Sequence, residues 1–171
     1  MKQKYPDEEV IAPGTVIISA AANCHDISKT IEPVFQECGG SIYYINISQE
    51  KFKLGGSAFG QVMNKIGNDV PNVKSASYLK NVFNTLQHLI IEKQIVAGHD
   101  IASGGLVTTL LEMCFSNNNI GANIDLTALQ ETDAIKVLFA ENVGVVIQSA
   151  NDQIESVFSK KGIEAINIGN V

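Results

Sequence analysis

The sequence predicts an α/β fold (α+β in strict usage), in which a mixed sheet is covered by helices on its faces. Strand-like and helix-like segments alternate along the chain, and 45% of the 171 residues are hydrophobic while only 18% are charged. The alternation favours a sheet packed against helices, and the composition supports a buried core. No segment repeats, so we expect one domain over residues 14–171 after a polar linker or lead-in over residues 1–13.

Short β-rich runs predict the strands. Residues 14–21 are apolar on both faces, as a buried strand is, and residues 41–48 carry isoleucine and tyrosine at strand-favouring positions. Shorter strands are expected at residues 95–99, 120–126, 143–148 and 163–168. The order of these strands in the sheet does not follow from the sequence.

Capping residues and four-residue spacing predict the helices. Ser75 or Ser77 begins the longest one, which runs to about residue 94 with one apolar stripe. Asp26 and Ser28 can cap a short helix that ends near the glycine pair at 39–40. Further helices are expected at residues 57–66, 106–115, 133–139 and 153–160.

Charge and composition exclude several classes of function. The net charge is −6 and there is no run of basic residues, so we expect no nucleic-acid partner. No apolar run approaches the roughly 18 residues of a membrane helix, and no apolar stretch follows the first residues, so neither a membrane association nor a signal peptide is expected. Because Cys24, Cys38 and Cys114 are scattered, we expect reduced thiols in a cytoplasmic protein.

Two glycine-rich stretches lie where a loop leads into a predicted helix. The first contains Gly55, Gly56 and Ser57, and the second contains Ser103 and the pair at 104–105. Consecutive glycines let the backbone approach an anion closely, and a helix N-terminus presents unpaired N–H groups. These residues are therefore candidates for binding phosphate. The alternative is a glycine pair required for a tight turn or for close helix packing.

Asp100 precedes the second glycine-rich stretch. A carboxylate beside a phosphate site suits Mg²⁺, which prefers carboxylate and phosphate oxygens and keeps several waters. We therefore consider Asp100 a candidate metal ligand, although an N-cap or an Asx turn would also explain an aspartate here. His99 is expected to be packed and bonded to the backbone. Neither His25 nor His88 has the spacing of a metal ligand.

Two acidic residues remain open to interpretation. Glu141 precedes a predicted buried strand, where it could bind a ligand, anchor an interface or lie in a solvated turn, and Glu112 has the same ambiguity. Although Cys24 adjoins His25, neighbouring residues rarely point at each other, so no nucleophile–base pair is expected. We therefore predict no catalytic residue in this chain.

Three motifs in a fixed order resemble a known family. They are Leu54-Gly-Gly-Ser-Ala58, His99-Asp-x-x-x-Gly-Gly-Leu106 followed by Leu-Leu-Glu-Met at 110–113, and Leu138-Phe-Ala-Glu-Asn-x-Gly-x-Val-Ile-Gln148. In this order they closely resemble the C-terminal domain in the second half of phosphoribosylformylglycinamidine synthase, which is like the C-terminal domain of aminoimidazole ribonucleotide synthetase. The resemblance runs from about residue 14 to the end.

The resemblance implies a role in purine biosynthesis. Members of the family are ATP-dependent carbon–nitrogen ligases that amidate formylglycinamide ribonucleotide with ammonia released from glutamine. It implies that the chain is an excised fragment, inactive alone, whose partners are N-terminal synthetase-like domains and a glutaminase domain of the parent. It also implies that the fragment helps form a cleft for Mg²⁺ and for ATP or ADP, with Asp100 as a metal ligand.

One position departs from the family pattern. The family's HDxSDGGL motif has a serine that contacts the nucleotide, and Ala102 occupies that position here. Ser103, one residue later, could supply the hydroxyl. The departure favours an alternative function, a non-catalytic scaffold domain that packs against partner domains. A third alternative is another member of the same superfamily, such as a protein of the selenophosphate or thiamine monophosphate kinase type. The motif at 139–148 argues against this alternative.

Overall fold

A five-stranded sheet forms the centre of the computed structural model, which describes residues 2–11, 17–24, 26–151 and 153–171. The strands lie in the order β4 (Ala97–Asp100), β6 (Gly144–Ser149), β3 (Ser41–Asn46), β7 (Ile166–Asn170) and β5 (Asn123–Ile124). All four neighbouring pairs are antiparallel. The predicted fold class, a sheet covered by helices, is confirmed, but the described sheet is antiparallel and not mixed, because each of its neighbouring strands runs in the opposite direction.

Strand β3 is apolar on both faces because the sheet is covered on both sides. Its residues Ile42 and Tyr44 enter one buried cluster, and Tyr43 and Ile45 enter the other. Successive side chains of a strand point to opposite faces, so an unbroken apolar run is what a doubly covered strand requires. Tyr44 lies opposite Val146 of β6 in the register.

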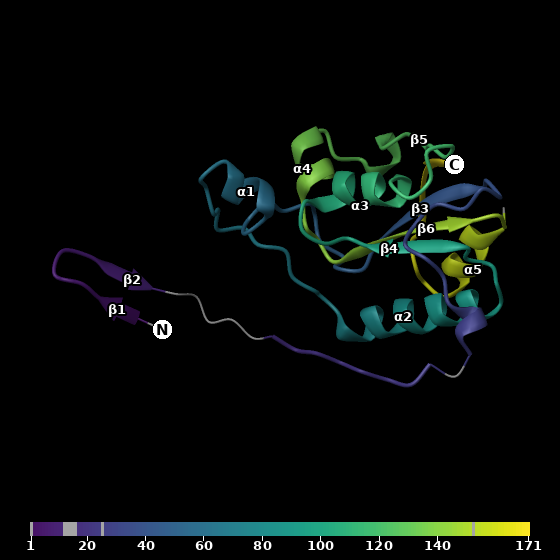
Figure 1. The fold of residues 1–171 in the computed structure, drawn as a ribbon, viewed down its shortest axis with the longest axis horizontal. Coiled ribbons are helices and arrows are strands. Elements are labelled where there is room, and N and C mark those ends of the chain that lie inside the picture. The colour runs from purple at the N-terminus through teal and green to yellow at the C-terminus, as the bar shows by residue number, and fades with distance from the viewer. Residues whose placement is uncertain (1, 12–16, 25, 152) are drawn as a thin grey trace.

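Helices form a layer on each face of the sheet (Figure 1). α2 (Ala76–Ile91) and α5 (Ile154–Lys160) cover one face, and α3 (Gly105–Cys114) and α4 (Ala134–Phe139) cover the other. A shorter helix, α1 (Ala58–Val62), follows the first glycine-rich loop.

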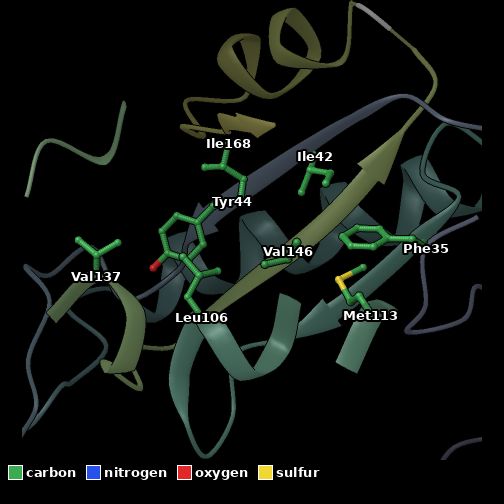
Figure 2. Close-up of a cluster of buried hydrophobic side chains, with 9 residues drawn as sticks. Phe35, Ile42, Tyr44, Leu106, Met113, Val137, Val146 and Ile168 are labelled. Atoms are coloured by element: carbon green, nitrogen blue, oxygen red, sulfur yellow. The ribbon is translucent and has the colours of Figure 1, made fainter. Parts of the chain in front are cut away.

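The cluster between the sheet and α3 is densely apolar (Figure 2). Leu106 and Met113 of α3 approach Val146 of β6, and Phe35 lies beside Met113, whose carbonyl accepts the Phe35 N–H at 2.8 Å. Burying a large apolar side chain contributes about 1.5–3 kcal/mol, so this cluster stabilises the packing of α3 against the sheet.

Local capping explains where several helices start. Ser75, one of the two caps expected for the longest helix, is the N-cap of α2, and Asp133 is the N-cap of α4; each side chain accepts a backbone N–H of the first turn. α1 is shorter than the predicted helix over residues 57–66. It ends at Val62, and the Lys65 N–H turns back to the Gly60 carbonyl at 2.7 Å.

The segment before β3 is not the predicted helix. Only a 3-10 turn, η1 (Ile27–Lys29), follows Asp26, which caps it as predicted. Pro33 has no N–H and disfavours a helical residue before it, so the turn cannot continue. The fully buried Gln148 side chain instead bonds the backbone of this segment, accepting the Gln36 N–H at 2.8 Å and donating to the Gly39 carbonyl at 2.8 Å.

The N-terminal region also differs from expectation. Within the predicted lead-in, β1 (Lys2–Lys4) pairs with β2 (Glu9–Ile11), and this hairpin lies apart from the sheet (Figure 1). The predicted buried strand over 14–21 is wrong for residues 17–21, which form no strand; Ile17 is 87% exposed, and residues 14–16 lie outside the described part. No described strand pairs with residues 17–21, and their apolar side chains are exposed.

All three cysteines, Cys24, Cys38 and Cys114, are free thiols, and burial raises the pKa of Cys114 above its ordinary value.

In the part of the chain that the structure describes, no helix combines the length and the apolar character needed to cross a membrane.

Candidate functional site

One carboxylate joins the two glycine-rich loops. Oε1 of Glu141 accepts the Ala58 N–H of the first loop at 2.8 Å and the Gly104 N–H of the second loop, also at 2.8 Å. Glu141 lies between α4 and β6, so three segments distant in sequence meet at this oxygen. Both N–H groups lie at helix starts, where an anion is favoured.

The first loop is held by bonds within the chain. Ser57 is 2% exposed; its hydroxyl donates to the Leu54 carbonyl at 2.7 Å and accepts the Gly60 N–H at 3.1 Å as the N-cap of α1. The Gly55 N–H donates to the carbonyl of residue 69 at 3.0 Å, and the Gly56 N–H donates to that of residue 66 at 2.7 Å. The polar groups expected to face phosphate are therefore used to shape the loop.

The second loop requires glycine at two consecutive positions. Gly104 and Gly105 have φ values of 94° and 74°, which L side chains rarely adopt. A side-chain carbon on Gly105 would also lie 2.7 Å from the Leu138 carbonyl oxygen at the end of α4. The glycine pair thus lets the start of α3 contact the end of α4, and the Gly105 N–H donates to the Ala102 carbonyl at 3.1 Å. Ser103 is exposed.

Packing next to Glu141 fixes its position. The rings of Phe59 in α1 and Phe139 in α4 stack with centroids 4.9 Å apart. Asn142 is 1% exposed; its side chain accepts the Lys53 N–H at 3.1 Å and donates to the Ser48 hydroxyl at 3.1 Å. Glu141 and Asn142 together therefore fasten the first loop to the body of the domain.

Asp100 ends β4, four residues before Gly104, and its side chain is 81% exposed. His99, which is 17% exposed, lies between two carboxylates: Nδ1 is 3.4 Å from Asp100 Oδ1, and Nε2 is 3.3 Å from Glu112 Oε2. Nδ1 also lies 2.8 Å from the Asp100 carbonyl oxygen, so His99 is packed and bonded to backbone as expected.

The structure allows a limited test of the predicted metal ligand. No group of three His, Cys, Asp or Glu residues in the described chain is arranged to hold an ion. Mg²⁺ commonly binds through one or two carboxylates with waters and substrate phosphate as the remaining ligands. The open carboxylate of Asp100 suits that mode as a single protein ligand, and its metal role stays a prediction.

The structure brings the two predicted loops together through Glu141, whose role the sequence left open. The N–H of Ala58, next to the loop at 55–57, and the N–H of Gly104 both donate to Glu141. Asp100 lies four residues before Gly104 at the end of β4. The alternative of a tight turn or close packing accounts for the glycine pairs by itself, so phosphate binding stays a prediction. Sequence reasoning named Asn142 only as a member of the third motif and gave it no role. The available signal was a polar pair placed directly before a buried strand.

Comparisons with known proteins identify the family. Residues 40–171 match the family model described as AIR synthase related protein, C-terminal domain. The chain belongs to this family. It is 42% identical over 173 residues to the probable phosphoribosylformylglycinamidine synthase, chloroplastic/mitochondrial, of Arabidopsis thaliana, and 33% identical over 175 residues to the human phosphoribosylformylglycinamidine synthase. The resemblance inferred from the three motifs is confirmed.

These alignments cover 98% and 99% of the chain but only 12% and 13% of the relatives. The chain therefore spans about one-eighth of their length.

Solved structures share the fold of this chain. The structure of PurLQS from Thermotoga maritima superposes with a TM-score of 0.59 at 12% identity, covering 85% of this chain and 24% of that one. PurL of T. maritima complexed with ATP gives a TM-score of 0.57 at 12% identity, covering 84% and 23%. At this identity the likeness shows a shared fold.

Proposed function

We propose that the chain acts as one domain of a phosphoribosylformylglycinamidine synthase, an ATP-dependent ligase of purine biosynthesis that amidates formylglycinamide ribonucleotide with ammonia from glutamine. The observation that carries the proposal is 42% identity over 98% of the chain to a relative of that name. The N-terminal synthetase-like domains and the glutaminase domain would be its partners. We place the synthase in the cytoplasm, whereas the name of the Arabidopsis relative places that protein in chloroplasts or mitochondria.

The domain would form one wall of a cleft for ATP or ADP. Glu141 holds the starts of α1 and α3 together, and two exposed residues, Asp100 before the second loop and Ser103 within it, would face this cleft. Asp100 would hold Mg²⁺, which would neutralise phosphate charge during phosphoryl transfer. Ser103 would supply the hydroxyl that Ala102 lacks. The other wall would come from another domain, so the free chain would be inactive.

A scaffold role without nucleotide contact is the second candidate. Existing hydrogen bonds favour the scaffold role, because the N–H groups of Gly55, Gly56 and Gly105 already donate to carbonyl oxygens within the chain. Ala102 favours it as well. In that case the loops serve close packing, and the domain contributes a surface against which other domains assemble.

A chimera tests the proposal. The matching segment of the Arabidopsis synthase is replaced by this chain, and formation of formylglycinamidine ribonucleotide from ATP, glutamine and formylglycinamide ribonucleotide is measured. We expect activity within tenfold of the unaltered enzyme. An assembled chimera without activity would overturn the proposed function.

Two further measurements separate the cleft role from the scaffold role. In the chimera, Asp100→Asn should raise the Mg²⁺ concentration required for half-maximal activity at least tenfold if the cleft role holds, and should change nothing if the domain is only a scaffold. Titration of the free chain with Mg–ADP by calorimetry should give no measurable heat. Turnover by the free chain would contradict its expected inactivity.

A further inference from the structure

An exposed apolar surface lies beside the first glycine-rich loop, on residues 58–70, here called the α1 lobe. Val62 is 84% exposed, Ile66 75%, Met63 56% and Val70 53%. Single exposed apolar residues are ordinary, whereas several gathered on one surface mark an interaction site. Four within nine residues therefore require an explanation.

The lobe is an ordered platform and not a loosely held loop. The Ile66 carbonyl accepts the Gly56 N–H at 2.7 Å, and the Gly60 carbonyl accepts the Lys65 N–H at 2.7 Å. A side-chain carbon on Gly60 would lie 2.6 Å from the Lys65 carbonyl oxygen, so the backbone of α1 and the backbone of the segment after it are in contact. This packing fixes the backbone while leaving the apolar side chains outside.

A hollow of about 390 Å³ borders the exposed side chains. Its apolar lining comes from Phe52, Leu54, Phe59, Met63 and Ile66. A hollow of this kind can receive an apolar side chain from a binding partner, and such anchors carry most of the binding energy in protein interfaces.

Two lysines at the hollow are available for a partner's charges. Lys65 and Lys136 both border it, and neither forms an ion pair within the described residues. Lys53, by contrast, is already paired with Glu50 and Asp69 at 3.1 and 3.3 Å. Beside an apolar hollow, these two positive charges favour an acidic partner surface.

We propose that the α1 lobe docks against another part of the same synthase polypeptide, which places an apolar side chain in the hollow and carboxylates opposite Lys65 and Lys136. The occupant is assigned to the synthase because this chain matches only 12–13% of its relatives' length, so that most of such an enzyme lies outside it. The proposal rests on the proposed function and adds to it a location and a chemistry.

Chemical footprinting tests the docking separately from activity. Acetylation of Lys65 and Lys136 and oxidation of Met63 are followed by mass spectrometry in the free chain and in the full-length chimera. Lys80, exposed on α2, is the matched control. We expect at least tenfold protection of Lys65, Lys136 and Met63 in the chimera and equal reactivity of Lys80.

The outcomes separate the two proposals. Protection without activity supports the docking and overturns the proposed function, whereas activity without protection overturns the docking. Protection already present in the free chain through self-association, detected by light scattering, would assign the lobe to a second copy and would also overturn it. If the chimera does not fold, footprinting of the unaltered Arabidopsis synthase at the positions aligned with residues 62–70 decides the question.

Substitution supplies an independent test. Val62→Ser with Ile66→Ser removes apolar surface from the lobe, and Phe83→Ser with Ile91→Ser removes exposed apolar surface from α2, where the two side chains are 58% and 48% exposed. We expect the lobe variant to abolish protection of Lys65 in the chimera and the α2 variant to leave it unchanged. Equal effects of the two variants would overturn the proposal.

Discussion

Replacing Glu141 tests whether one carboxylate holds the two loops together. Glu141→Gln keeps the size of the side chain and an acceptor oxygen but removes the charge from two hydrogen bonds, each 2.8 Å long. A hydrogen bond to a charged group contributes about 1.5–3 kcal/mol and a neutral one about 0.5–1.5 kcal/mol. Because Glu141 is only partly buried, water offsets some of the loss, and we expect the free energy of unfolding to fall by about 1–2.5 kcal/mol.

Glu141→Ala, which removes both acceptors, should lower the free energy of unfolding by about 2–4 kcal/mol. For a domain of this length, each kcal/mol lowers Tm by about 2–4 °C. Thermal unfolding followed by circular dichroism therefore resolves both variants. Glu155→Gln, an exposed substitution on α5, is the matched control and should stay within about 0.5 kcal/mol of the unaltered chain.

Hydrogen exchange provides the decisive readout because it reports each loop separately. In Glu141→Gln the amides of Ala58 and Gly104 should exchange at least tenfold faster, and together, while amides of β3 change only with global stability. Faster exchange at one loop alone, or a Tm within 1 °C of the unaltered chain, would refute the conclusion that Glu141 joins the loops.

Three further predictions follow from the same geometry. Gly105→Ala should cost about 2–4 kcal/mol in urea unfolding because of its positive φ and its contact with the end of α4, whereas Gly121→Ala, with open space around it, should stay within about 0.5 kcal/mol; similar values would contradict the close-packing role of Gly105. Asp100→Asn should leave the Tm of the free chain unchanged within 1 °C, since the side chain is 81% exposed; a larger shift would indicate a structural role. The Asn72 N–H, and secondarily Lys53, lower the pKa of Glu50, so the ionised carboxylate stabilises the fold above the ordinary glutamate pKa of about 4.3, and this contribution disappears as pH falls through the lowered value. The stability difference between the unaltered chain and Glu50→Gln should therefore be constant at pH 6–7 and shrink below about pH 4.3, and a difference independent of pH down to 2 would contradict this.

The elements that were predicted well are those whose signals are local. Ser75, one of the two caps expected for the longest helix, caps α2, and the short helix expected at 133–139 forms as α4, because capping and helical spacing depend only on neighbouring residues. The strand predicted at 41–48 from its isoleucine and tyrosine residues forms as β3, and both of its faces are covered.

Elements that depend on distant partners were predicted poorly. Residues 17–21 have the pattern of a buried strand but no described strand to pair with. The helix predicted from Asp26 and Ser28 to near the glycine pair at 39–40 does not form beyond η1, because Gln148 bonds the backbone of this segment from over 100 residues away, which no local rule contains. Glu141 remained ambiguous for the same reason, since its two partners lie 83 and 37 residues from it in sequence.

By itself, the sequence determined the family, the alternation of strands and helices and the two glycine-rich helix starts, since these depend on neighbouring residues and on residue order. The tertiary structure alone decided that the helix starts meet at the Glu141 carboxylate, that their N–H groups are largely used within the chain, and that the α1 lobe exposes apolar side chains. The physical reason is that hydrogen-bond partners and burial are set by which segments approach each other in space, and local pattern does not encode that approach.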